Sequence, residues 1–175
     1  SRVLVGARST ILLALLATII GSTVGALIGL ISAYFGGRID EIIMRIVDAV
    51  MAIPGLLFAL LIISALGSSA INAVIAIGIT FAPGMARVSR SITLTVREQD
   101  YVAAAVARGE GAAWIILREI APNILAPVIV ESTIRVAFAI MLLATLSFLG
   151  MGAQPPSPEW GLMISDARAH LYRSP

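Results

Sequence analysis

Residues 100–123 read DYVAAAVARGEGAAWIILREIAPN, a polar interruption in an otherwise apolar chain. The alanines favour a narrow helix that we expect Asp100 to cap, and Gly109 stands where a left-handed residue ends a helix. A second helix is predicted over 112–121, with Pro122 ending it. Such a helix pair at a membrane surface either docks in a groove of a partner or lies on the lipid headgroups.

The composition of the chain excludes a water-soluble globule. Of its 175 residues, 59% are hydrophobic and 13% are charged, and the mean hydropathy is +1.00. Soluble domains carry about a quarter charged residues, so this chain has too little polar surface to face water. We therefore predict an all-α fold, a polytopic helical bundle in a membrane, forming one domain over residues 1–175.

Missing residue types remove several kinds of chemistry. The chain has no cysteine and no lysine, which excludes disulfides, thiol catalysis, Schiff bases and a P-loop of the Gly-Lys-Ser/Thr kind. The single histidine, His170, has no neighbouring metal ligands in the sequence. A net charge of +2 is too small to indicate nucleic acid binding. We expect no catalytic residue, no metal site and no bound cofactor.

Long uncharged runs predict about four spans, because a helix needs about 20 apolar residues to cross the bilayer. The predicted spans cover residues 9–35, 46–66, 70–86 and 123–148. A cytoplasmic loop over 87–122 separates the last two, and an outer loop follows over 149–175. Because both ends of the chain are abrupt, we expect further spans on one or both sides.

Small and cyclic residues mark packing within these spans. Small residues recur at every fourth position of the first span, at Gly21, Gly25, Gly29 and Ala33. They share one helix face, where a neighbouring helix can approach closely. Pro54 and Pro83 are expected inside helices, where each would act as a hinge or a fixed bend.

Charged residues near or within the spans must find partners. Asp40, Glu41 and Arg45 predict an amphipathic interfacial helix, and we expect Asp48 to pair with Arg45 or with a neighbouring helix. Two further charges, Glu131 and Arg135, lie four residues apart inside the last span. At that depth they should face protein or water, either on the translocation pathway or at a seam between helices or subunits.

The distribution of arginine predicts the topology. Seven arginines fall on the side of the loop over 87–122, namely Arg38, Arg45, Arg87, Arg90, Arg97, Arg108 and Arg118. The other side has four, namely Arg2, Arg8, Arg168 and Arg173. Because positive charge is retained inside, this loop is expected in the cytoplasm.

The interrupting segment resembles the cytoplasmic loop of ABC importer permeases, the binding-protein-dependent transport family. The matching positions are Ala104, Ala105, Gly109, Ile115, Ile116, Pro122 and Asn123. Two positions depart from the pattern: Ala103 stands where a glutamate is usual, and Glu119 where a histidine is usual. The missing carboxylate at 103 removes a charge contact to an ATPase at that point but leaves helix-in-groove docking open.

Other stretches are similar to the dipeptide/oligopeptide branch of this family, and within it to the second of two permease subunits. These stretches are residues 1–9, Tyr34–Asp40, Arg45–Asp48, Leu146–Gly150 and Pro155–Gly161. Permeases of this branch serve dipeptides, oligopeptides, glutathione, nickel chelates or sugar conjugates, and the sequence does not choose among them. Such subunits usually have six spans.

The resemblance implies half of a translocation pore in a bacterial inner membrane. The other half would be a second, related permease, two cytoplasmic ABC ATPases would hydrolyse ATP, and an extracytoplasmic binding protein would deliver solute near Pro155–Trp160. The implied ATPase-coupling residues are Tyr101, Val102, Ala103, Ala104, Ala105, Arg108, Gly109, Glu110, Trp114 and Ile116. The alternatives are a secondary transporter or channel, a membrane scaffold, or a permease of another importer branch.

Overall fold

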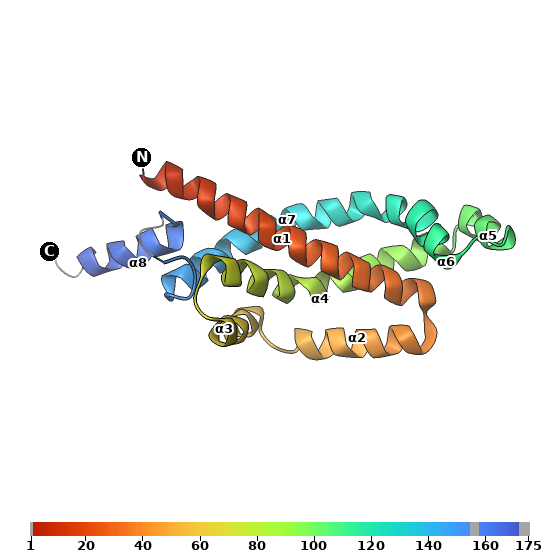
Figure 1. Ribbon diagram of the computed structural model, residues 1–175, viewed down its shortest axis with the longest axis horizontal. Helices are drawn as coiled ribbons and strands as arrows, with labels where there is room; N and C mark the ends of the chain where they lie inside the picture. Colours follow the sequence, from red (N-terminus) through yellow and green to blue (C-terminus); the bar gives the residue numbers. More distant parts are fainter. Residues whose placement is uncertain (1, 155–157, 172–175) are drawn as a thin grey trace. The chain divides into compact units, whose positions relative to one another are not determined.

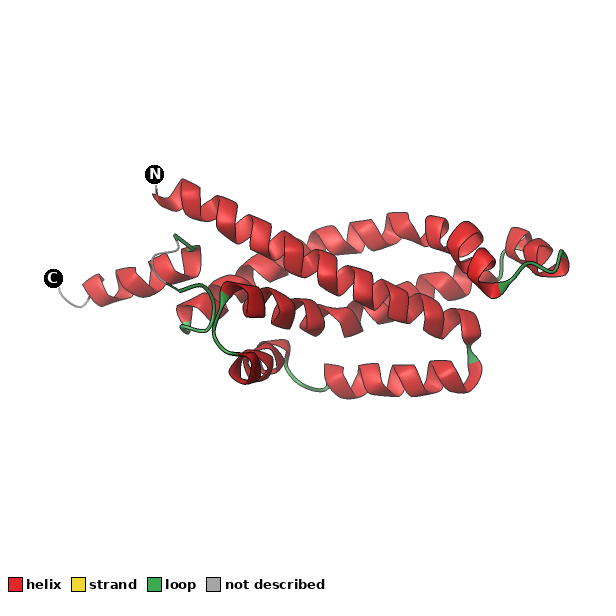
Figure 2. Cartoon of the chain, in the orientation of Figure 1, coloured by secondary structure: helices red, strands yellow, loops and turns green. Residues whose placement is uncertain are grey.

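The computed structural model describes residues 2–154 and 158–171, so Pro155, Pro156 and Ser157 of the expected outer loop lie outside the described residues. The elements are α1 (Arg2–Phe35), α2 (Gly37–Met51), α3 (Gly55–Leu66), α4 (Ala70–Arg97), α5 (Asp100–Ala107), α6 (Ala112–Trp114), the π-helix η1 (Ile115–Ile120), α7 (Ala121–Phe148) and α8 (Trp160–Leu171) (Figure 1). The described residues form helices joined by short loops (Figure 2). The predicted all-α class is confirmed.

Two compact units share these helices. Unit 1 comprises Ser1–Gly21, Pro54–Thr80 and Ile134–Pro175, and unit 2 comprises Ser22–Ile53 and Phe81–Thr133. Unit 2 therefore holds α2, α5, α6 and η1, together with the second parts of α1 and α4 and the first part of α7. Each unit is described by itself.

Three helical stretches of the described chain are long and apolar enough to cross a membrane. They are Val3–Phe35, Ala70–Arg97 and Ala112–Phe148. A fourth candidate exists only as a broken pair, Gly37–Met51 with Gly55–Leu66. The described residues thus contain three such helices, or four if the broken pair forms one span, against about four predicted.

The break between α2 and α3 corrects one expectation. Pro54 does not lie inside a helix; it is the N-cap of α3, with φ −54° and ψ 130°. Proline fixes φ and has no N–H to donate, so it cannot continue the helix that precedes it. Here α2 ends before Pro54, and α3 begins directly after it. Pro83, by contrast, lies inside α4, which continues to Arg97 rather than ending near residue 86.

In unit 2, glycines let α1 and α4 pack backbone to backbone. A methyl group on Gly25 would lie 2.6 Å from Cβ of Met85. At Gly29 it would overlap the carbonyl oxygen of Ala86 and lie 2.7 Å from the amide nitrogen of Arg90. The predicted close approach is confirmed at both glycines, and it permits dispersion contacts that hold membrane helices together.

The ends of α1 and α4 meet in unit 2. The Arg97 guanidinium donates to the carbonyl oxygen of Ala33 at 2.9 Å, and its Nη1 lies 3.4 Å from where a Cβ on Gly36 would be. The turn after α1 and the segment after α4 therefore lie at the same end of this unit, as the predicted topology requires.

In unit 1, the start of α1 lies beside the start of α8. Trp160 donates its indole N–H to the carbonyl oxygen of Val3 at 3.1 Å. Gly6 faces Pro158 so closely that a side chain there would overlap the Pro158 carbonyl group. The amino terminus of α1 and the segment after α7 thus share one end of unit 1, again as predicted.

Replacing Gly29 with alanine should destabilise the protein by about 1–3 kcal/mol, because the added methyl group meets backbone that cannot move aside. The matched control is Gly111→Ala: no atom lies within 4 Å of that position, and its φ of −71° suits any residue. The unfolding midpoint of the purified protein in detergent measures both changes. Equal midpoints for the two variants would contradict close packing at Gly29.

Candidate functional site

The site begins with α5, the helix predicted from its alanines. It starts at Asp100, and the N-cap is Gln99, which makes no side-chain cap. The expectation that Asp100 caps the helix is therefore wrong by one residue. A carboxylate in the first turn still stabilises the helix, since it faces the positive end of the helix dipole.

The carboxyl end of α5 is closed as predicted. Gly109 has φ +79°, a conformation that glycine adopts without strain. Its N–H donates to the carbonyl oxygen of Val106 at 3.0 Å, and the N–H of Glu110 donates to that of Ala105 at 3.2 Å. This pair of bonds is the Schellman motif, and it fixes the direction in which the chain leaves the helix.

One face of α5 is anchored in an apolar cluster of unit 2. Val102 is 2% exposed and Ala105 is fully buried. The cluster consists of Leu30 from α1, Val102 and Ala105 from α5, Ile115 and Ile120 from η1, and Ile124 from α7. Half-buried Ile116 packs against it. Because this cluster excludes water, α5 is held to the neighbouring helices without needing a partner protein.

The opposite face of α5 is open and carries small or apolar side chains. Ala103 and Ala104 are exposed, as are Tyr101 (40%) and Val106 (59%). Small side chains let the backbone of a second protein come close, as the docking hypothesis requires.

The predicted coupling residues thus divide by exposure. Val102 and Ala105 are buried, whereas Ile116 and Glu110 are half-buried. The exposed ones are Tyr101, Ala103, Ala104, Arg108, Gly109 and Trp114.

The segment after α5 contains a feature that the sequence did not reveal. The expectation that Pro122 ends a helix is wrong, since α6, η1 and α7 form one continuous stretch from Ala112 to Phe148. Pro122 cannot donate to the preceding turn, and its ring needs the extra room that a wider π turn provides. Asn123 donates its side-chain amide to the carbonyl oxygen of Glu119 at 2.6 Å. Short π segments occur frequently at functional sites.

Arg108 links the end of α5 to η1. Its Nη2 lies 3.7 Å from the carboxylate of Glu119, and its Nε lies 3.7 Å from that of Glu110. Glu119 is one of the two positions that depart from the family pattern. The structure gives its carboxylate a cationic partner.

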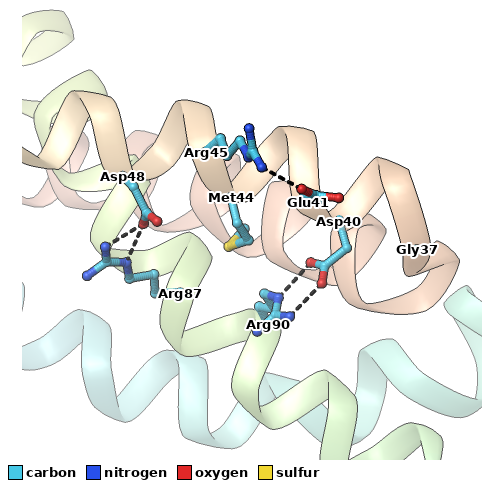
Figure 3. A pocket seen from close by; sticks show the side chains of 8 residues that line it. All are labelled: Gly37, Asp40, Glu41, Met44, Arg45, Asp48, Arg87 and Arg90. Atoms are coloured by element: carbon cyan, nitrogen blue, oxygen red, sulfur yellow. Dashed lines mark hydrogen bonds and ion pairs between the residues drawn. The ribbon is translucent and has the colours of Figure 1, made fainter.

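Three ion pairs surround a cavity of about 660 Å³ between α2 and α4 (Figure 3). It is lined by Gly37, Asp40, Glu41, Met44, Arg45, Asp48, Arg87 and Arg90. Within α2, Arg45 pairs with Glu41 at 2.7 Å. Between the helices, Asp48 pairs with Arg87, so of the two partners expected for it the neighbouring helix is the one observed.

The most sheltered of these pairs joins Asp40 to Arg90. The guanidinium donates to both carboxylate oxygens, from Nε at 2.6 Å and from Nη2 at 2.5 Å, and Ser32 donates to the same carboxylate. Such two-point pairs fix orientation as well as distance. They matter for α2 because Val47 is the single buried residue of that helix.

Glu131 and Arg135 both lie on α7, where each is half-buried. Their position on one helix agrees with the predicted spacing. A place on the pathway or at a subunit seam stays a prediction for both.

A buried carboxyl in unit 1 was missed at the sequence level. Glu159 is fully buried, and its Oε2 accepts a hydrogen bond from the Ser147 hydroxyl at 2.7 Å. Burial raises the pKa of Glu159, while hydrogen bonds from Ser147 and the Ala153 amide act in the opposite direction. The stretch around Glu159 contributed to the family resemblance, but nothing in the residue pattern showed that this acid is enclosed.

The fold and the surface of α5 define a polytopic, all-helical membrane protein. The chain belongs to the family of the binding-protein-dependent transport system inner membrane component, whose pattern matches residues 21–171. This is a family of transport components rather than of enzymes, and the expected location in a bacterial inner membrane is confirmed.

Among similar proteins, the glutathione transport system permease protein GsiD of Escherichia coli is 41% identical over all 175 residues. The protein of that name from Pectobacterium atrosepticum is 37% identical over the same length. The dipeptide transport system permease protein DppC of Haemophilus influenzae is 39% identical over 171 residues, 98% of this chain. The chain spans 58% of the length of each of these relatives.

The raised pKa of Glu159 predicts that α8 is held less firmly as pH rises. The folded state keeps the proton at a pH where the unfolded chain has lost it, so stability falls from about pH 4.5 upward through the folded pKa. Replacing Glu159 with glutamine imitates the protonated acid and should remove this dependence. Amide-exchange protection factors across α8, corrected for intrinsic rates between pH 4 and 8, would test this; parallel slopes in both proteins would contradict it.

Proposed function

We propose that this chain is the core of a permease subunit in an ATP-driven importer. Its membrane helices would form half of a translocation pore, with a second, related permease forming the other half. The observation that carries the proposal is the divided surface of α5, which is anchored through Val102 and Ala105 and open through Tyr101, Ala103 and Ala104.

A divided surface suits the transmission of movement. A partner can displace a membrane helix only through an element that is fixed to it, and the apolar cluster fixes α5 to Leu30 of α1 and Ile124 of α7. The open face would receive a cytoplasmic ATPase. ATP-driven movement of the ATPase would then favour one arrangement of the helices over another by differential binding.

The partners and the solute follow from the relatives. The family is that of binding-protein-dependent transport systems, and the relatives are permeases of glutathione and dipeptide transport systems. We therefore propose an extracytoplasmic binding protein, two ATPases, and a peptide or small peptide-like solute. This role requires neither a catalytic side chain nor a cofactor in the chain, because the partner subunits hydrolyse ATP.

Family membership counts against a secondary transporter or channel as the alternative. An ATP-driven importer and a secondary transporter differ in their source of energy. If uptake by the complete system continued with ATP depleted and the ion gradients held, the proposed function would be wrong.

Cysteine cross-linking tests the docking face, since residues 1–175 contain no cysteine that would compete with an introduced one. With the full-length protein assembled in membranes, Ala103→Cys and Val106→Cys should each join to an ATPase through a short cysteine-to-amine reagent. The matched controls on the same helix, Val102→Cys and Ala105→Cys, are buried and should give no adduct. Maleimide labelling of Ala103→Cys and Val106→Cys without any ATPase adduct would exclude docking at α5.

Gly109 offers a second test. A side chain at this position would strain the backbone, because φ is positive, but its Cβ would not meet any neighbouring atom. No atom lies within 4 Å of its missing side chain, so Gly109→Val should act through the backbone, at a cost of about 1–3 kcal/mol. We expect this variant to insert normally but to uncouple ATP hydrolysis from uptake. Gly109→Asn is the control, since asparagine tolerates the left-handed region. Normal transport by Gly109→Val would count against the docking role.

A further inference from the structure

We propose that the ion pair between Arg108 and Glu119 sets the angle of α5 against η1, so that movement of a docked ATPase reaches α7. This inference rests on the proposed function. It assigns both residues a positioning role, because neither needs to touch the solute or the nucleotide.

The need for such a pair follows from how α5 is attached. The apolar contact is made by Val102 and Ala105, which lie in the first six residues of the helix. Beyond its carboxyl end, the turn contains Gly109 and Gly111, and no atom lies within 4 Å of a side chain built at either position. The backbone hydrogen bonds of Gly109 and Glu110 fix how the helix ends, but no side-chain packing restrains the chain at Gly109 or Gly111, so small rocking of α5 about its apolar anchor is left to other contacts to limit.

Arg108 is placed to stop that rocking. It is the C-cap residue of α5, and its guanidinium reaches Glu119 in the last turn of η1, just before α7 begins at Ala121. The contact ends on the next-to-last residue of the six-residue π segment, whose hydrogen-bond pattern departs from the α-helices on either side. Movement of α5 would thus reach the α7 end of η1 through this pair as well as through the apolar cluster.

The geometry of arginine suits this role. Its five N–H donors lie in one plane and can serve two carboxylates at once, here Glu110 in the turn and Glu119 in η1. The side chain of Arg108 is 53% exposed and that of Glu119 is 22% exposed. Pairs this exposed contribute little to overall stability, so removing one should change the orientation of α5 and leave folding intact.

The pair also accounts for the glutamate at position 119. A histidine there would leave Arg108 without a carboxylate in η1. A cation at the carboxyl end of α5 is favoured by the helix dipole in any case, so the glutamate is what turns Arg108 into a link between two elements.

The test uses the full-length protein with its partner subunits in proteoliposomes. The measured quantity is solute taken up per ATP hydrolysed. Arg108→Gln and Glu119→Gln should each lower this ratio by about threefold, a change within the range of free energies measured for one exposed ion pair. The charge swap, Arg108→Glu with Glu119→Arg, should restore it. Glu110→Gln is the matched control, since it removes a partner of Arg108 that lies in the turn and not in η1.

The outcomes separate this inference from the proposed function. If the unmodified protein shows no ATP-dependent uptake, both are wrong. If it transports normally and both glutamine variants keep its ratio, the pair has no positioning role. Failure of the swap to restore the ratio would also overturn the inference, and so would a lowered unfolding midpoint with the ratio unchanged.

Discussion

Burial of Val102 and Ala105 against Leu30, Ile115, Ile120 and Ile124 is the contact on which the rest of the proposed mechanism depends. It joins a short surface helix to two membrane helices. Without that contact, an eight-residue helix would be marginal in water and could not carry load. With it, the remaining surface of α5 is free to meet a second protein.

Polar contacts have a different role in this chain from that in a soluble domain. Lipid tails are as apolar as leucine, so burial does not by itself drive two membrane helices together. Unit 2 instead joins α1 to α4 by close backbone packing at Gly25 and Gly29. It joins α2 to α4 by paired charges, with Arg90 holding Asp40 at two points. Both ways of joining helices depend on residue type at single positions: glycine at 25 and 29, and an acid and an arginine at 40 and 90.

Features that depend on nearby residues in the sequence were predicted most accurately. The length of apolar runs predicted the helical class, the four-residue spacing of glycines predicted close packing, and Gly109 predicted a left-handed helix end. The effects of Pro54 and Pro122 were not predicted correctly. Pro54 begins a helix, whereas Pro122 follows a π turn within a continuous helix, and the residue type alone does not distinguish these outcomes. Nor could a linear pattern show that Glu159 is enclosed.

The amino-acid sequence alone determined that this protein lives in a bilayer, that it is helical, and that residues 100–123 form an unusual surface element. Those properties follow from composition and from contacts between residues a few positions apart. Only the tertiary structure decided which face of α5 is anchored, which arginine each acid meets, and that Arg108 reaches Glu119. Asp40 and Arg90, or Asp48 and Arg87, are about 40 to 50 positions apart, and Arg108 and Glu119 lie on different helices, so these pairs exist only once the helices have packed.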